Sequence, residues 1–162
     1  MSEQITIRPA GVADVPAILQ FIRDLATYEH LEHEVVATEA TLREGLFGAR
    51  PYAEVVLACL KGEPVGFALF FHNFSTFLGR AGIYLEDLYV RPEARGHGVG
   101  RRLLTWLAGT ALSRGCGRLE WAVLDWNEPS IRFYRNLGAV PMNEWTTFRV
   151  TGTALHQLAE RI

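Results

Sequence analysis

The sequence YLEDLYVRPEARGHGVGRRLL, from Tyr84 to Leu104, joins a predicted strand to a predicted helix through a glycine-rich loop. Its beginning is apolar and rich in β-forming residues, and it carries two adjacent carboxylates, Glu86 and Asp87. Its end starts an apolar stripe at helical spacing. Between them, every second residue from 96 to 100 is glycine, which has no Cβ and lets a ligand approach the backbone closely. The stretch therefore predicts a ligand-binding turn between a strand and a helix.

Phosphate is the ligand that suits this turn. The first N–H groups of a helix have no partner within the helix, and the helix dipole makes that end positive. Arg95, Arg101 and Arg102 add positive charge around the glycines. The spacing differs from the Walker loop GxxxxGK(S/T) and from the dinucleotide-binding GxGxxG, whose third glycine position is taken by Arg101. We predict a pyrophosphate-binding loop; the alternative is a plain turn, which rarely has three alternating glycines beside three arginines.

The rest of the chain alternates between strand and helix patterns, with no repeat or linker, and predicts a single α/β domain over residues 1–162. Strands are predicted at 4–8, 53–60, 65–74, 83–90, 118–124 and 145–150. Helices are predicted after Asp14 and Thr38, over 100–114, from Pro129 to near Gly138, and over 153–161. This order predicts a mixed central sheet with helices on both faces.

Composition argues against several classes of protein. A formal net charge of -2 is unlike that of a dedicated nucleic-acid binder, which is usually strongly basic. Cys59 and Cys116 form no CxxC pair, and no Cys/His spacing resembles a metal site, so we expect no metal. The first residues, MSEQITIRP, lack the pattern of a signal peptide, and no apolar run reaches membrane-spanning length. We therefore expect a cytoplasmic protein with no nucleic-acid or membrane partner.

Two motifs resemble those of the GNAT N-acetyltransferase superfamily. Arg95, Gly98 and Gly100 match its acetyl-coenzyme A signature, Arg-x-x-Gly-x-Gly. The stretch WNEPSIRFY at 126–134, followed by LGA at 137–139, is similar to a later element of the superfamily. In that element an asparagine, a helix N-terminus and a tyrosine lie beside the cosubstrate.

Four stretches narrow the resemblance to a subgroup. They are IRPA at 7–10, LATYE at 25–29, YLED at 84–87 and WNEPS at 126–130. Together they resemble the spermidine/spermine N1-acetyltransferase (diamine acetyltransferase) subgroup, which also includes thialysine acetyltransferases. The resemblance implies the GNAT fold, acetyl-CoA as cosubstrate and direct acetyl transfer to a primary amine. It also implies a homodimer, with residues 145–150 as the candidate contact segment.

The resemblance further implies which residues contact acetyl-CoA. The backbone of the strand faces the pantetheine arm, the glycine loop holds the pyrophosphate, and the start of the later helix adds further contacts. An amide of this strand, that of Leu88, also steadies the thioester oxygen. The implied contacts are Leu88, Val90, Arg95, Gly96, His97, Gly98, Val99, Gly100, Arg101, Asn127, Ser130 and Tyr134.

Two residues are candidate catalysts. By resemblance, Tyr134 lies near the sulfur of the cosubstrate and donates a proton to the leaving thiolate, and a tyrosine keeps its proton at neutral pH. Its helical spacing leaves the alternative of a core tyrosine. Glu86 is the candidate base, acting on the amine through water. The alternative for Glu86 and for Asp87 is an ion pair at the strand end, with Arg80 or Arg91.

The amine is expected to bind among carboxylates. By resemblance, Glu29 and Asp87 contact a cationic substrate. A regular strand points Glu86 and Asp87 to opposite faces, and a bulge, which family members have in this strand, would re-aim one of them. Three glutamates between 29 and 34 suit an acidic funnel that concentrates a cation; the alternative is a solvated helix end.

The stretch before Tyr84 departs from the polyamine enzymes. Ser75 and Phe77 stand where those enzymes carry an Asp and a Trp, and Phe77 remains an expected substrate contact. The loss of one anionic contact makes a shorter diamine or a lysine-like amine competitive with spermidine and spermine. Acetylation of a protein or aminoacyl substrate, and a non-catalytic acetyl-CoA-binding sensor, are the alternative functions.

Overall fold

The computed structural model describes residues 4–161, which form two compact units, one ending at Leu124 and the other starting at Asp125. The predicted single domain over 1–162 also includes residues 1–3 and 162, which lie outside the described residues, and it stays a prediction. Across residues 4–161, no helix is both long and apolar enough to cross a membrane.

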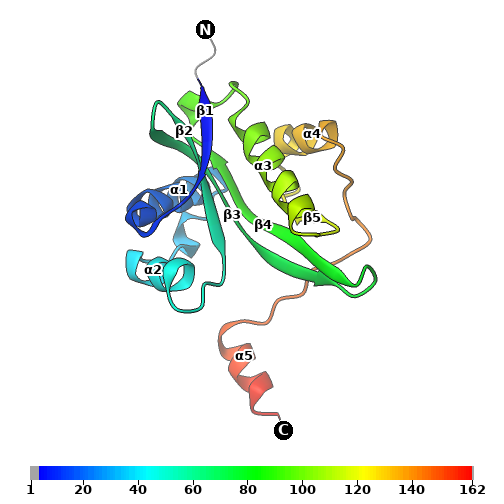
Figure 1. Ribbon diagram of the computed structural model, residues 1–162. Helices are drawn as coiled ribbons and strands as arrows, with labels where there is room; N and C mark the ends of the chain where they lie inside the picture. Colours follow the sequence, from blue (N-terminus) through cyan, green and yellow to red (C-terminus); the bar gives the residue numbers. More distant parts are fainter. Residues whose placement is uncertain (1–3, 162) are drawn as a thin grey trace. The chain divides into compact units, whose positions relative to one another are not determined.

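The first unit is built around one mixed sheet (Figure 1). Its strands, in spatial order, are β1 (Ile5–Pro9), β2 (Glu54–Leu60), β3 (Glu63–Ser75), β4 (Arg80–Val90) and β5 (Leu119–Trp121). Strands β1 to β4 pair in antiparallel fashion, and β5 runs parallel to β4. The predicted mixed sheet is confirmed, although its last strand is shorter than the predicted 118–124.

A tight turn sets the antiparallel order of β2 and β3. The two strands are joined at Lys61 and Gly62, whose φ angles are 50° and 80°. Positive φ at both turn positions matches the right-handed twist of a hairpin. The strands predicted at 53–60 and 65–74 therefore form a hairpin, and β3 continues through a second turn into β4, the strand that carries Glu86 and Asp87.

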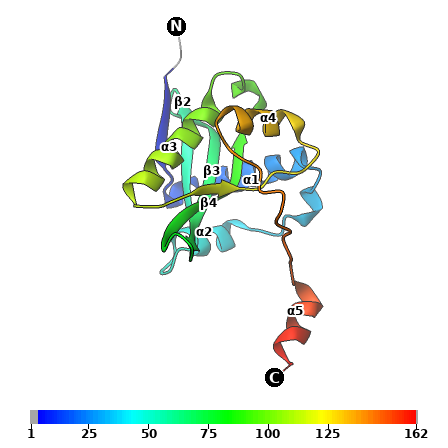
Figure 2. The same cartoon turned by 90° about the vertical axis from the view of Figure 1, so that its right-hand side faces the viewer.

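Helices cover both faces of the sheet in this unit. They are α1 (Val15–Tyr28), α2 (Glu39–Phe47) and α3 (Val99–Ser113). Figures 1 and 2 show α1 and α2 on one face and α3 on the other. All three follow predicted helix starts. The Thr38 hydroxyl, for example, accepts a hydrogen bond from the Thr41 N–H at 3.2 Å and caps α2.

Aromatic contacts on both faces of the sheet anchor α1 and α3 to β3. Side chains alternate between the faces of a strand, so Phe67 and Phe70 point in opposite directions. Phe67 stacks on Phe21 of α1 with ring centroids 5.4 Å apart, and Phe70 meets Trp106 of α3 edge-on at 6.0 Å. Phe21, Phe67 and Phe70 are fully buried, so β3 lies at the centre of the core on both faces.

The second unit contains α4 (Glu128–Asn136) and α5 (Gly152–Ala159). The buried Asn127 caps α4, because its side-chain oxygen accepts a hydrogen bond from the Ser130 N–H at 3.4 Å. Pro129 occupies the first turn, and Gly138 follows the helix with φ at 93°. The sequence predicted both ends of α4 correctly.

The strand predicted at 145–150 is wrong. This segment belongs to no strand, and Trp145 and Phe148 are exposed by 76% and 91%. A strand needs a neighbour that satisfies its backbone hydrogen-bonding groups, and residues 125–161 supply none. Residues 145–150 therefore form an exposed apolar segment of this unit and not a strand.

Candidate functional site

A bulge in β4 places Glu86. Leu69 of β3 lies opposite Asp87, whereas the next residue, Phe70, lies opposite Leu85. Glu86 is therefore the extra residue, and the alternation of side chains changes at this point. Leu85 is buried, Glu86 is exposed, and Asp87 is partly buried. The bulge expected in this strand is confirmed.

The bulge lets two consecutive carboxylates share one pocket. Glu86 and Asp87 both line a cavity of about 420 Å³, which we call the acidic pocket. Glu29, at the end of α1, also lines it. The complete lining is Ile22, Leu25, Ala26, Glu29, Leu31, Glu34, Val35, Val36, Ala37, Glu86 and Asp87. The acidic pocket therefore combines four carboxylates with an apolar wall.

The apolar wall of the acidic pocket was not predicted from the sequence. It is formed by α1 and by residues 31–37, which include the short 3₁₀ helix η2 (Glu32–Glu34). Glu34 is one of the three glutamates between 29 and 34 noted in the sequence. The path of residues 31–37 brings Glu34 to the acidic pocket, whereas Glu32 does not line it. The sequence shows that this segment is acidic, but it does not show which of its glutamates faces the pocket.

The structure does not bring Phe77 to the acidic pocket. Phe77 lies in the turn between β3 and β4 and is 95% exposed. Its neighbour Ser75 is buried, and the Ser75 hydroxyl accepts a hydrogen bond from the Leu78 N–H at 3.1 Å, which stabilises the turn. A substrate contact by Phe77 stays a prediction.

Burial perturbs the acidic pocket electrostatically. Burial, reinforced by the charges of Glu86 and Glu29, raises the pKa of Asp87 from 3.8 to about 6. Burial also raises the pKa of Glu29. Carboxylates that are crowded together and partly removed from water favour a cation, because a cation relieves both the repulsion and the lost solvation.

β4 leaves part of its edge unpaired next to this pocket. β5 pairs with β4 only at Ile83–Leu85, opposite Leu119–Trp121. The Arg91 N–H donates to the Val65 carbonyl of β3 at 2.8 Å. The backbone N–H and C=O groups of successive residues in a strand point to opposite sides. Those of Leu88 and Val90 therefore point away from β3, to the edge of β4 that β5 does not reach. An extended ligand can pair with such an edge.

The glycine loop, Arg95–Gly100, follows directly. Gly96 and Gly98 have φ angles of 82° and 80°, which glycine adopts readily, and a Cβ added to either would meet open space. α3 begins at Val99, and no side chain caps it, so the N–H groups of its first turn are open to a ligand. The Val99 side chain is buried, which leaves its backbone as the part that can contact a ligand.

Arg95 fixes the loop to the rest of the unit. Its guanidinium lies 5.4 Å from the ring centroids of both Tyr28 and Tyr89, and its Nε donates to the Val90 carbonyl at 2.9 Å. These contacts tie the loop to the end of α1 and to β4. The Arg95 side chain is therefore an anchor for the loop, and Tyr28 precedes Glu29 of the acidic pocket.

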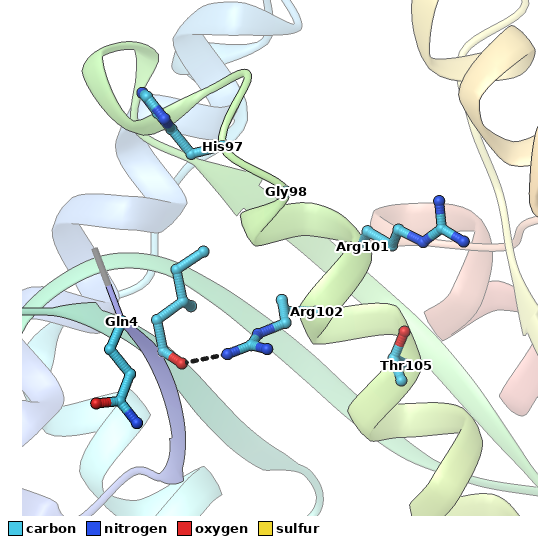
Figure 3. A pocket seen from close by; sticks show the side chains of 7 residues that line it. Gln4, His97, Gly98, Arg101, Arg102 and Thr105 are labelled. Atoms are coloured by element: carbon cyan, nitrogen blue, oxygen red, sulfur yellow. Dashed lines mark hydrogen bonds between the residues drawn. The ribbon is translucent and has the colours of Figure 1, made fainter. Parts of the chain in front are cut away.

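A second cavity, of about 660 Å³, lies beside the start of α3, and we call it the α3 pocket (Figure 3). Its lining residues are Gln4, Ile5, His97, Gly98, Arg101, Arg102 and Thr105. Arg102 extends toward β1, where its Nη2 donates to the Ile5 carbonyl at 2.8 Å. The contributions of Gln4 and Thr105 were not predicted, because they depend on the packing of β1 beside α3.

The second unit carries the other predicted site residues. Asn127 and Ser130 form the start of α4, as described above, and Tyr134 lies one turn further along the helix. The Tyr134 side chain is partly buried, and its ring centroid lies 5.6 Å from that of Phe133. Their cosubstrate contacts, and the catalytic role of Tyr134, stay predictions.

Comparison with known proteins establishes the family. The sequence profile of the Acetyltransferase (GNAT) family matches residues 16–139, so the chain belongs to this family of enzymes. It is 41% identical over 166 residues to a thialysine N-epsilon-acetyltransferase from Bos taurus, covering 96% of this chain and 97% of that protein. It is 34% identical over 197 residues to an L-ornithine N5-acetyltransferase from Arabidopsis thaliana, covering 94% and 86%.

A solved structure shows the same fold. An integron cassette protein from the mobile metagenome of V. cholerae matches with a TM-score of 0.81 and 27% sequence identity, covering 99% of each chain. The resemblance to GNAT acetyltransferases that the sequence showed is thus confirmed, as is the fold that it implied.

Replacing Asp87 tests the electrostatics of the acidic pocket. The folded protein holds the Asp87 proton more tightly than the unfolded chain, so its ionisation lowers the free energy of unfolding as the pH rises from about 4 to about 6. Asp87→Asn removes this loss. We expect the variant to be more stable than the wild type at pH 7 by on the order of 1–3 kcal/mol, and not near pH 4.

Urea unfolding of both proteins across this pH range measures the difference. Asp125→Asn, at an exposed position, is the matched control and should leave stability unchanged at both pH values. If the Asp87→Asn variant is no more stable than the wild type at pH 7, the raised pKa of Asp87 is contradicted.

Proposed function

We propose that this enzyme transfers the acetyl group of acetyl-CoA directly to a primary amine of a small cationic substrate, either a diamine or polyamine or a lysine-like amine. The observation that carries the proposal is the arrangement around residues 86–90. The same short stretch of β4 has an unpaired backbone edge next to the glycine loop and supplies two carboxylates to the acidic pocket. An acetyl donor and a cationic amine can thus meet along one strand.

The chain offers acetyl-CoA a fitting site. The open N–H groups of Gly96–Gly100 suit a pyrophosphate, and the backbone of Leu88 and Val90 suits the extended pantetheine arm. In this proposal the Leu88 N–H also donates to the thioester oxygen as negative charge develops on it during transfer. Asn127 and Ser130 at the start of α4 complete the set of contacts.

The acidic pocket suits the amine. Asp87 and Glu29 attract the substrate cation, and the apolar wall accepts an aliphatic stem. The reacting nitrogen must lose a proton before it can attack, because an ammonium has no lone pair. Glu86 is exposed and close enough to Asp87 to share its pocket, so it can accept that proton through water. Names of the relatives, which refer to thialysine and L-ornithine, support amines of this kind.

A homodimer and a cytoplasmic location complete the proposal. The apolar side chains Trp145, Phe148 and Val150 are exposed in a segment without a strand partner among the described residues. A second copy of the chain would remove these side chains from water and satisfy the backbone of the segment.

A panel of amines tests the proposed reaction. Release of coenzyme A from acetyl-CoA is measured with cadaverine, lysine, thialysine, putrescine, ornithine and spermidine. We expect at least one of these cations to accelerate release, because the acidic pocket concentrates them. The matched control is 6-aminohexanoate, in which a carboxylate replaces one ammonium group of cadaverine, and we expect it to be a poor substrate. Absence of coenzyme A release with every cation, or a preference for the zwitterionic control, would contradict the proposal.

Tyr134→Phe tests the proposed acid. Removing the hydroxyl leaves the thiolate without its proton donor, so we expect turnover to fall by roughly a hundredfold or more. Acetyl-CoA affinity, measured by calorimetry, should change little. Tyr52→Phe, at a residue 82% exposed, is the matched control and should keep normal turnover. Equal turnover in Tyr134→Phe and wild type would remove Tyr134 from the mechanism.

A further inference from the structure

The Arg95 guanidinium joins the glycine loop to two other elements of the first unit. It lies 5.4 Å from the ring centroids of both Tyr28, the last residue of α1, and Tyr89 of β4. Its Nε also donates a hydrogen bond to the Val90 carbonyl at 2.9 Å. No carboxylate forms an ion pair with Arg95 within residues 4–161. The two rings and the carbonyl therefore hold this side chain in place.

The two tyrosines differ in their surroundings. Tyr89 is buried and packs against Phe21 of α1, with ring centroids 6.3 Å apart, so it belongs to the core between α1 and the sheet. Tyr28 is 37% exposed and is not part of this core. The contact of Tyr28 with Arg95 is therefore a role that packing of the core does not explain.

The glycine loop has few other contacts that fix its conformation. Gly96 and Gly98 have positive φ angles, and a Cβ added to either would meet open space. Within the described part of the chain, residues 96–98 donate no backbone hydrogen bond to another backbone group. Ordering such a loop when a ligand binds costs conformational entropy, and this cost weakens binding. A contact that fixes the beginning of the loop in advance reduces the cost.

We infer that Tyr28 is a positioning residue for acetyl-CoA: through Arg95, it holds the glycine loop in the conformation that binds the cosubstrate. This inference rests on the proposed function. It gives the end of α1 two separate tasks, because Glu29, the next residue, lines the acidic pocket. The ring of Tyr28 supports the loop for the acetyl donor, and the carboxylate of Glu29 attracts the amine.

The turn that places Glu29 does not depend on the Tyr28 ring. The Glu29 N–H donates to the Leu25 carbonyl at 2.9 Å, and the Leu31 N–H donates to the Ala26 carbonyl at 2.8 Å. These hydrogen bonds close the end of α1 through the backbone alone. Loss of the ring should therefore leave Glu29 in the acidic pocket, so the effects on the two substrates can be separated.

Tyr28→Leu removes the ring and keeps an apolar side chain. We expect the dissociation constant of coenzyme A, measured by calorimetry without an amine, to rise about three- to tenfold, the size of a partly exposed cation–π contact. Tyr28→Phe keeps the ring and should bind coenzyme A as the wild type does. Tyr52→Leu makes the same change at a residue 82% exposed, and this matched control should also bind normally.

Steady-state kinetics separate the loop from the acidic pocket. They are measured with the amine of the panel above that gives the fastest release of coenzyme A. In Tyr28→Leu the KM for acetyl-CoA should rise by a factor similar to that of the dissociation constant. The turnover number and the KM for the amine should change little, because Glu29 keeps its place.

A double-mutant cycle shows whether Tyr28 acts through Arg95. Arg95→Gln removes the anchor and should weaken coenzyme A binding by itself. If the two side chains act together, adding Tyr28→Leu to Arg95→Gln should cause no further loss. Urea unfolding of each variant verifies that it folds, and Tyr28→Gln takes the place of Tyr28→Leu if the latter does not.

Unchanged coenzyme A affinity in Tyr28→Leu, an equal loss in Tyr28→Phe, or a full further loss in the Arg95→Gln background would overturn the inference and leave the proposed function standing. A KM for the amine that rises as much as the KM for acetyl-CoA would also count against it, because this would indicate a general disturbance of the site. Failure of coenzyme A to bind the wild type would instead overturn acetyl-CoA as cosubstrate, and the inference with it.

Discussion

The site depends on one extra residue in β4. Successive side chains of a regular strand point to opposite faces, so Glu86 and Asp87 could not share a pocket without the bulge. The register shift beside Leu69 and Phe70 changes the alternation and brings both carboxylates to the acidic pocket. The pairing of β5 with β4 ends at Leu85, immediately before the bulge. The bulge at Glu86 thus coincides with two features of the site: Glu86 and Asp87 share the acidic pocket, and the backbone edge of β4 is unpaired beyond Leu85.

The crowded carboxylates of this site lower the free energy of unfolding, and packing elsewhere in the first unit offsets this loss. Ionised Asp87 is crowded by Glu86 and Glu29 and partly removed from water, which is unfavourable until a cation arrives. β3, the strand next to the bulge, is held on both faces by buried aromatic rings. Arg95 adds a further connection between the loop, α1 and β4. The binding groups therefore sit on a rigid frame, which keeps their geometry despite their repulsion.

Much of the frame could be predicted from local sequence. Alternating apolar residues predicted the strands of the sheet, Thr38 and Pro129 marked helix starts, and three glycines marked the loop before α3. These features depend on neighbours in the chain, and their physical causes are visible in a short window. The bulge was expected only through the resemblance to a family, because nothing in YLED by itself fixes which residue is unpaired.

Other features depend on contacts between distant segments. Glu34 and the apolar wall reach the acidic pocket through the path of residues 31–37, and Gln4 reaches the α3 pocket through the packing of β1. The apolar pattern at 145–150 predicted a strand, but a pattern does not supply the neighbour that a strand requires. Phe77 was predicted to contact the substrate because of its position relative to the polyamine enzymes. In the structure it lies in the exposed turn before β4, outside the acidic pocket.

Amide hydrogen exchange at Leu88 and Val90 tests most directly whether the open edge of β4 is where acetyl-CoA binds. The neighbouring amide of Tyr89, which faces β3, is an internal reference. We expect the Leu88 and Val90 amides to exchange much faster than that of Tyr89 in the free protein, and to slow markedly when acetyl-CoA is added. Protection of Leu88 and Val90 equal to that of Tyr89 in the free protein, or exchange that acetyl-CoA leaves unchanged, would contradict a binding edge here.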